Sequence, residues 1–119
     1  MPLVVIQYAA RPISRQVLIR LVAALPDVVA AALDVPGLPE GRLTPEDIEV
    51  WVQESGDLNL NIKDLEIVIW ANLYPERLEN LTERNGIIAS FVRDFLRKYG
   101  SGLNGYVWTM LQPAAFSQL

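Results

Sequence analysis

The residue with the most distinctive chemistry in this chain is Pro2, in an opening Met1-Pro2 that leads into the apolar run Leu3 to Ala10. Small second residues permit removal of the initiator methionine, and Pro2 would then carry a free secondary amine. An α-amino group titrates at about 8 in its reference state, and burial or a neighbouring arginine lowers its pKa. An amine with a pKa of about 7 is a competent general base, able to take a proton from a carbon beside a carbonyl. The simpler alternative is a proline that only begins an edge strand.

Arginine is the natural partner of such a base. A guanidinium binds a carboxylate through two hydrogen bonds and stabilises the negative charge of an enolate. Arg42 precedes the second predicted strand and could line the same cavity as Pro2. A solvated loop charge is the alternative for Arg42. Arg15 and Arg77 begin the two predicted helices, and we interpret them as structural.

Composition excludes several kinds of site. The 119 residues form one domain with no cysteine and no histidine, which removes thiol chemistry, disulfides and histidine-based triads. No metal or other cofactor is expected. The formal net charge of −4 disfavours nucleic acid as a partner. The N-terminus lacks the basic region of a signal peptide and the apolar runs are too short to span a bilayer, so we expect a cytoplasmic protein with no membrane partner.

The hydrophobic pattern predicts the elements that position these residues. Two amphipathic helices are expected, one capped by Ser14 and kinked or split at Pro26, and one over Pro75 to Tyr99 that is weakened at Asn85-Gly86 and ended by Gly100 and Gly102. Alternating or continuous apolar residues predict strands over 3–10, 48–53, 65–70 and 106–111, with a short edge strand over 58–62.

The order strand–helix–strand occurs twice, which indicates an internal duplication with halves at about 1–56 and 57–119. Each half ends in a strand that carries Val-Trp, at Val50-Trp51 and Val107-Trp108. Right-handed β-α-β units place both helices on one face of a four-stranded mixed sheet, an α+β fold. The first and third strands are apolar on both faces. We therefore expect the face without helices to pack against another subunit.

Two β-α-β repeats headed by Met1-Pro2 resemble the tautomerase superfamily, whose members use an amino-terminal proline as catalyst. The chain looks most like the 5-carboxymethyl-2-hydroxymuconate isomerase group, through Met1-Pro2, the Trp51-Val52-Gln53 segment and the ending Leu111-Gln112-Pro113. The resemblance implies a homotrimer and cofactor-free interconversion of keto and enol forms of a small unsaturated carboxylate. It makes Pro2 the base and adds Tyr106 and Trp108, on the last strand, to the candidate substrate-binding residues. Core or interface packing is the alternative for Trp108.

The resemblance also makes Arg11, which ends the first predicted strand, a candidate for binding a substrate carboxylate. Oxalocrotonate-type relatives carry a substrate-binding arginine within about one position of it. A solvated loop charge is the alternative for Arg11.

Departures from that superfamily narrow the expected chemistry. Glu49 stands where oxalocrotonate-type relatives have an arginine, and Asn72 and Tyr74 stand where decarboxylase and dehalogenase relatives carry an arginine pair. No acidic residue follows Asp94, so a C-terminal carboxylate that could activate water is missing. These departures argue against decarboxylation, dehalogenation and hydration, so simple keto–enol tautomerisation is the expected activity. They also disfavour substrates with two carboxylates. The same departures favour one alternative, a catalytically inactive binding or scaffold protein with this fold. The third hypothesis is a small α+β domain of a different family, in which the proline at position 2 is a coincidence.

Overall fold

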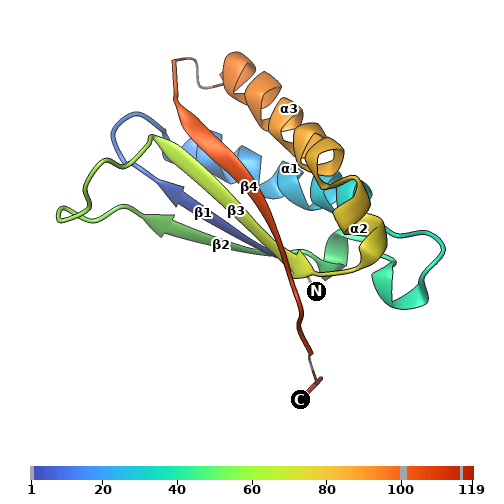
Figure 1. Ribbon diagram of the computed structural model, residues 1–119. Coiled ribbons are helices and arrows are strands. Elements are labelled where there is room, and N and C mark those ends of the chain that lie inside the picture. Colours follow the sequence, from blue (N-terminus) through green and yellow to red (C-terminus); the bar gives the residue numbers. More distant parts are fainter. Residues whose placement is uncertain (1, 100–101, 116) are drawn as a thin grey trace.

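Four strands form one twisted mixed sheet in the order β2-β1-β3-β4 (Figure 1). The computed structural model describes residues 2–99, 102–115 and 117–119. The strands are β1 (Leu3–Tyr8), β2 (Glu49–Glu54), β3 (Leu65–Asn72) and β4 (Gly105–Gln112). The outer strands β2 and β4 run parallel to their neighbours β1 and β3, and the two central strands are antiparallel. The expected α+β architecture is confirmed.

Both long helices, α1 (Arg15–Leu33) and α3 (Leu81–Tyr99), lie on the same face of the sheet (Figure 1). The Ser14 hydroxyl caps α1 by accepting a hydrogen bond from the Val17 N–H at 3.2 Å, as expected. A short helix, α2 (Pro75–Glu79), precedes α3. The 3₁₀ turns η1 (Pro39–Gly41) and η2 (Pro45–Asp47) lead from α1 to β2.

Three sequence-based expectations about these elements are wrong. Helix α1 is not split at Pro26: it runs unbroken from Arg15 to Leu33, and Leu25 and Val29 beside the proline are fully buried in the core. The second predicted helix, over Pro75 to Tyr99, is not continuous: it breaks at Asn80, which leaves helical geometry at φ −129°. Residues 58–62 form a protruding loop and not an edge strand (Figure 1). The expected terminator Gly100 lies outside the described residues.

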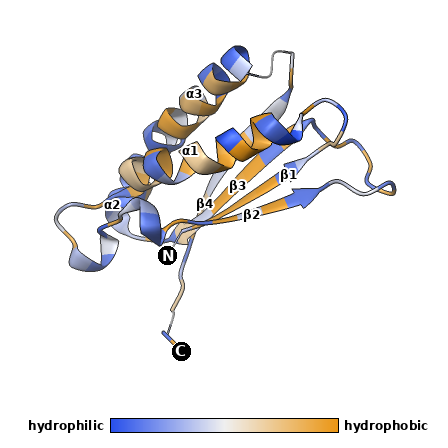
Figure 2. Cartoon of the chain, turned by 180° about the vertical axis from the view of Figure 1, so that it is seen from behind, coloured by the Kyte–Doolittle hydropathy of each residue, from blue (hydrophilic) through white to orange (hydrophobic). Residues whose placement is uncertain are grey.

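The core lies between the helices and one face of the sheet. Val4 and Ile6 of β1 and Ile67 and Ile69 of β3 are fully buried there, opposite the buried side of α1. Figure 2 shows hydrophobic colour along most of β1 and β3. Helix α1 is long and apolar enough to cross a membrane by length and composition alone, contrary to the expectation that no run reaches that length. In the fold, α1 packs on the sheet through its buried side chains, which include Leu21, Leu25 and Val29.

The opposite face of the sheet, which we call the open face, has no helix over it among the described residues. The strand register arranges its side chains in three rows across the sheet. These rows are Glu49–Leu3–Trp70–Met110, Trp51–Val5–Val68–Trp108 and Gln53–Gln7–Glu66–Tyr106. Trp51, Trp108 and Tyr106 are each about half exposed, at 56%, 49% and 50%. An apolar strip thus crosses the whole open face.

Two arginines from the second half of the chain anchor the C-terminal end of α1. The buried Arg77 donates from Nε to the Leu33 carbonyl at 2.8 Å and from Nη1 to the Asn72 carbonyl at 3.1 Å. Arg84 donates from Nη1 to the carbonyls of Ala32 and Asp34, at 3.0 and 2.9 Å. These guanidinium groups satisfy carbonyls that a helix end leaves unpaired and complement its partial negative charge. Burial lowers the pKa of Arg77. These contacts support the structural role expected for Arg77.

Two glycines allow a matched test of the pairing between β3 and β4. A Cβ at Gly105, the first residue of β4, would lie 1.8 Å from the Leu65 backbone oxygen, whereas a Cβ at Gly86 in α3 meets nothing within 4 Å. We expect Gly105→Ala to lower the free energy of unfolding by about 1–3 kcal/mol, because the β3–β4 pairing must shift. Gly86→Ala is expected to raise it by about 0.5–1 kcal/mol. Urea denaturation of both variants checks this; equal effects would contradict the register of β4.

Candidate functional site

Pro2 lies buried at the head of β1, at the end of the sheet where β3 and β4 finish. Its carbonyl accepts a hydrogen bond from the Glu49 N–H at 3.2 Å, which joins the starts of β1 and β2. The next residue, Leu3, pairs with Trp70 of β3. Antiparallel pairing therefore places the chain start against the end of β3.

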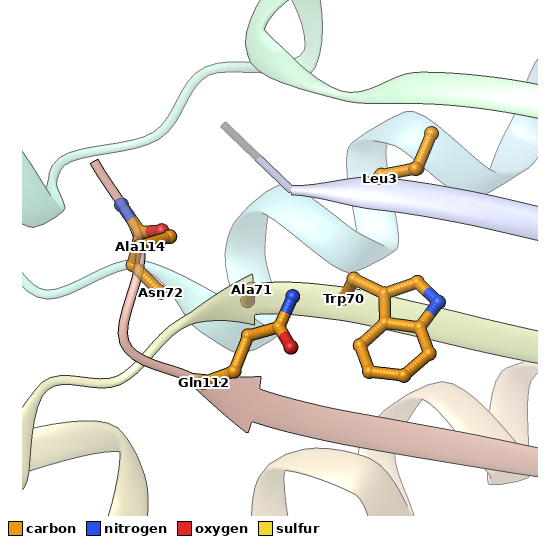
Figure 3. Close-up of a pocket in the computed structure, with 6 residues that line it drawn as sticks. All are labelled: Leu3, Trp70, Ala71, Asn72, Gln112 and Ala114. Atoms are coloured by element: carbon orange, nitrogen blue, oxygen red, sulfur yellow. The ribbon is translucent and has the colours of Figure 1, made fainter. Parts of the chain in front are cut away.

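A cavity of about 380 Å³ opens beside this chain start, lined by Leu3, Trp70, Ala71, Asn72, Gln112 and Ala114 (Figure 3). Figure 3 shows the Gln112 side chain reaching from the end of β4 across β3, between the Trp70 indole and the Asn72–Ala114 side. The structure gives the amide groups of Asn72 and Gln112 no hydrogen-bond partner among the residues it describes. Both amides are free to donate to, or accept from, a bound molecule.

Arg42 lies at the Pro2 end of the molecule, in the segment between η1 and η2. Its Nε is 3.5 Å from the Asp34 carboxylate, which also accepts a hydrogen bond from the Leu43 N–H at 2.9 Å. Arg42 is therefore partly neutralised by an acid at the end of α1. It does not line the cavity.

Arg11 lies at the opposite end of β1 from Pro2, exposed in the loop that leads to α1. The six residues of β1 separate the two ends by roughly 20 Å, at about 3.3 Å per residue. One chain therefore does not bring Arg11 and Pro2 together.

Tyr106 and Trp108 lie on the open face, away from the cavity of the same chain. The register places Trp108 opposite Val68 and Tyr106 opposite Glu66, one and two rows from the row that contains Trp70. The Trp108 indole N–H donates to Glu66 Oε1 at 2.9 Å, and the Trp51 indole N–H donates to Glu49 Oε1 at 3.0 Å. With both N–H groups satisfied, the indoles present mainly apolar surface.

Sequence reasoning did not select the cavity residues Trp70 and Gln112 as site residues. A signal for them was present in the strand alternation: Trp70 and Asn72 lie two apart, as do Met110 and Gln112, so each pair shares a face. The missing information was the register, which sets β4 beside β3 with Gln112 opposite Asn72. The arrangement offers the buried Pro2 at the head of β1, an aromatic wall and two neutral amides.

No protein-family model matches this chain, and no curated protein matches its sequence. Solved structures do match its fold. Pt0534 inactivated by 2-oxo-3-pentynoate is 16% identical with a TM-score of 0.62, covering 98% of this chain and 90% of that one. The macrophage migration inhibitory factor-like protein of Entamoeba histolytica is 12% identical with a TM-score of 0.58, covering 95% and 88%.

A fused 4-OT asymmetric trimer is 11% identical with a TM-score of 0.54, and the match covers 94% of this chain and 85% of that one. The three likenesses extend over nearly the whole of this chain, and they agree with the sheet order and the placement of both helices. At these identities they establish the fold alone: this chain has the tautomerase-like fold shared by macrophage migration inhibitory factor and 4-OT proteins.

Proposed function

We propose that this protein is a cofactor-independent tautomerase that interconverts the keto and enol forms of a small 2-oxo or 2-hydroxy unsaturated carboxylate in the cytoplasm. The observation that carries the proposal is the burial of Pro2 at the head of β1, beside a cavity with an apolar wall. Once Met1 is removed, the Pro2 nitrogen is a secondary amine, and burial favours its neutral, basic form. It takes a proton from carbon beside the substrate carbonyl and returns it at the other end of the conjugated system.

We propose that the active form is a homotrimer in which the open face is covered by other copies of the chain. Trp51, Val5, Val68 and Trp108 form a continuous apolar row there, and exposed apolar patches of this kind mark interfaces. The trimer recorded for the fused 4-OT supports this number of subunits.

A second copy also supplies what one chain lacks at Pro2. Arg11 lies roughly 20 Å from Pro2 of its own chain, at about 3.3 Å per strand residue. We propose that Arg11 of one copy holds the substrate carboxylate at Pro2 of another, and that Tyr106 and Trp108 reach that site in the same way. Arg42 is a weaker candidate for binding the substrate carboxylate, because it is already paired with Asp34. We also propose that the chain belongs with the 5-carboxymethyl-2-hydroxymuconate isomerase group, on the support of Met1-Pro2, the Trp51-Val52-Gln53 segment and the ending Leu111-Gln112-Pro113.

The rival proposal is an inactive protein of the same fold that binds or scaffolds. Glu49 favours it, because an acid at the start of β2 lies in the same row as Leu3, next to Pro2. The two proposals differ in one observable, which is turnover by protein that has lost Met1.

Replacement of the secondary amine of Pro2 by the primary amine of alanine tests the catalytic proposal. Protein whose intact mass shows loss of Met1 is expected to ketonise phenylenolpyruvate, and Pro2→Ala is expected to lower kcat/KM on the order of a hundredfold, since general-base catalysis contributes at least that much. The ultraviolet absorbance of the enol follows the reaction. Equal rates for wild type and Pro2→Ala would disprove the role of Pro2, and no turnover by Met1-free wild type would favour the scaffold.

A charge on the open face tests the trimer. Scattering or sedimentation of the wild type is expected to give about 40 kDa, three chains of 13.3 kDa each. Val68→Asp places an unpaired carboxylate in the middle apolar row and is expected to give monomers. Ile19→Asp, on the exposed side of α1, introduces the same charge and is expected to keep the trimer. A monomeric wild type would refute the proposal.

Subunit mixing tests whether Arg11 acts across an interface. Arg11→Ala and Pro2→Ala are each expected to lose activity. When the two variants are unfolded together and refolded, some sites combine an intact Pro2 from one chain with an intact Arg11 from another. Recovery of part of the wild-type rate is expected in the mixture alone. A mixture no more active than its components would place Arg11 outside the site.

A further inference from the structure

We infer that the Trp70–Asn72–Gln112 cavity binds an uncharged aryl or acyl group, so that the substrate carries a single carboxylate, bound elsewhere in the site. This inference rests on the proposed tautomerase function and names the substrate class. The cavity volume of about 380 Å³ is within the range of small-molecule sites, about 300–1,000 Å³.

The first observation is that the arginines at this end of the molecule are already engaged. Arg77 is 2% exposed, and its Nε and Nη1 donate to the carbonyls of Leu33 and Asn72. Arg84 donates to Ala32, Asp34 and the Asn80 side chain, and Arg42 pairs with Asp34. All three are held at the C-terminal end of α1. Among the described residues that line the cavity, none is charged.

The second observation is the chemistry of the lining itself. Asn72 and Gln112 pair across β3 and β4 and bring two neutral amides to the same row. An amide both donates and accepts, so the pair matches a carbonyl, an enol hydroxyl or a phenol. Trp70 and Leu3 supply a flat apolar wall against which a ring or a planar conjugated chain packs.

The third observation is that the one charged residue in the strand row of Leu3 and Trp70 is an acid. Glu49 lies in the row of Leu3 and Trp70, two strands from Trp70, and its carboxylate accepts a hydrogen bond from the Trp51 indole N–H. A second substrate carboxylate in the cavity would lose water and find no cation among the described lining residues. Desolvating a charge without a partner is unfavourable, so the cavity discriminates against diacids.

A matched pair of ligands tests the inference directly. Phenylpyruvate and 4-carboxyphenylpyruvate differ by one carboxylate, and their dissociation constants for Met1-free protein are measured by titration calorimetry. We expect the monoacid to bind more tightly on the order of tenfold or more. Equal or tighter binding of the diacid would overturn the inference, as would absence of binding by both.

Substitution of Asn72 tests whether the preference for the monoacid arises in the cavity. Asn72→Arg adds a cation to the lining and is expected to abolish or reverse the preference for the monoacid. Gln16→Arg changes the net charge equally at the exposed start of α1 and is expected to leave it unchanged. An unchanged ratio in Asn72→Arg would contradict the assignment. These binding constants do not depend on turnover, so their failure is distinguishable from a Pro2→Ala variant that retains wild-type activity, which would reject the proposed function instead.

Discussion

The rest of this structure depends on one imbalance: the two central strands are apolar on both faces, while the helices cover one. Val4, Ile6, Ile67 and Ile69 bury their side chains under the helices, and Leu3, Val5, Val68 and Trp70 point the other way. Burial of apolar surface contributes about 25 cal/mol per Å², so leaving this strip in water is costly. In our proposal, a second copy of the same chain covers this strip and removes it from water. In that proposal, the assembly and the division of the site between subunits follow from the composition of the sheet.

A second constraint acts at the C-terminal end of α1. A helix end leaves carbonyls without partners, and in this chain Arg77 and Arg84 reach from the second half of the sequence to satisfy them. The same contacts join the two halves of the chain at the end where Pro2 lies. The guanidinium groups of that region are therefore occupied in holding the end of α1. The neutral character of the cavity beside Pro2 is therefore linked to how the helix is capped.

Much of the fold could be predicted because its signals are local. The Ser14 cap, the alternation in β2 and the continuous apolar runs of β1 and β3 each predict an element without reference to distant residues. The errors arose where tertiary contacts outweigh local preference. Packing of Leu25 and Val29 on the sheet carries α1 through Pro26. Residues 58–62 alternate like a strand, but no neighbouring strand of the described chain pairs with them, so they form a loop.

The sequence by itself determined which chemical groups are available: there is no histidine and no cysteine, and Pro2 is the residue that we propose as the base. It also determined the layered β-α-β arrangement, because hydrophobic periodicity encodes which face of each element is buried. Only the tertiary structure decided what lies beside Pro2. Sheet register brings Trp70, Asn72 and Gln112 to the chain start and leaves Arg11 at the far end of β1. Register is a property of paired strands, so residues far apart in sequence reveal their proximity only when the sheet has formed.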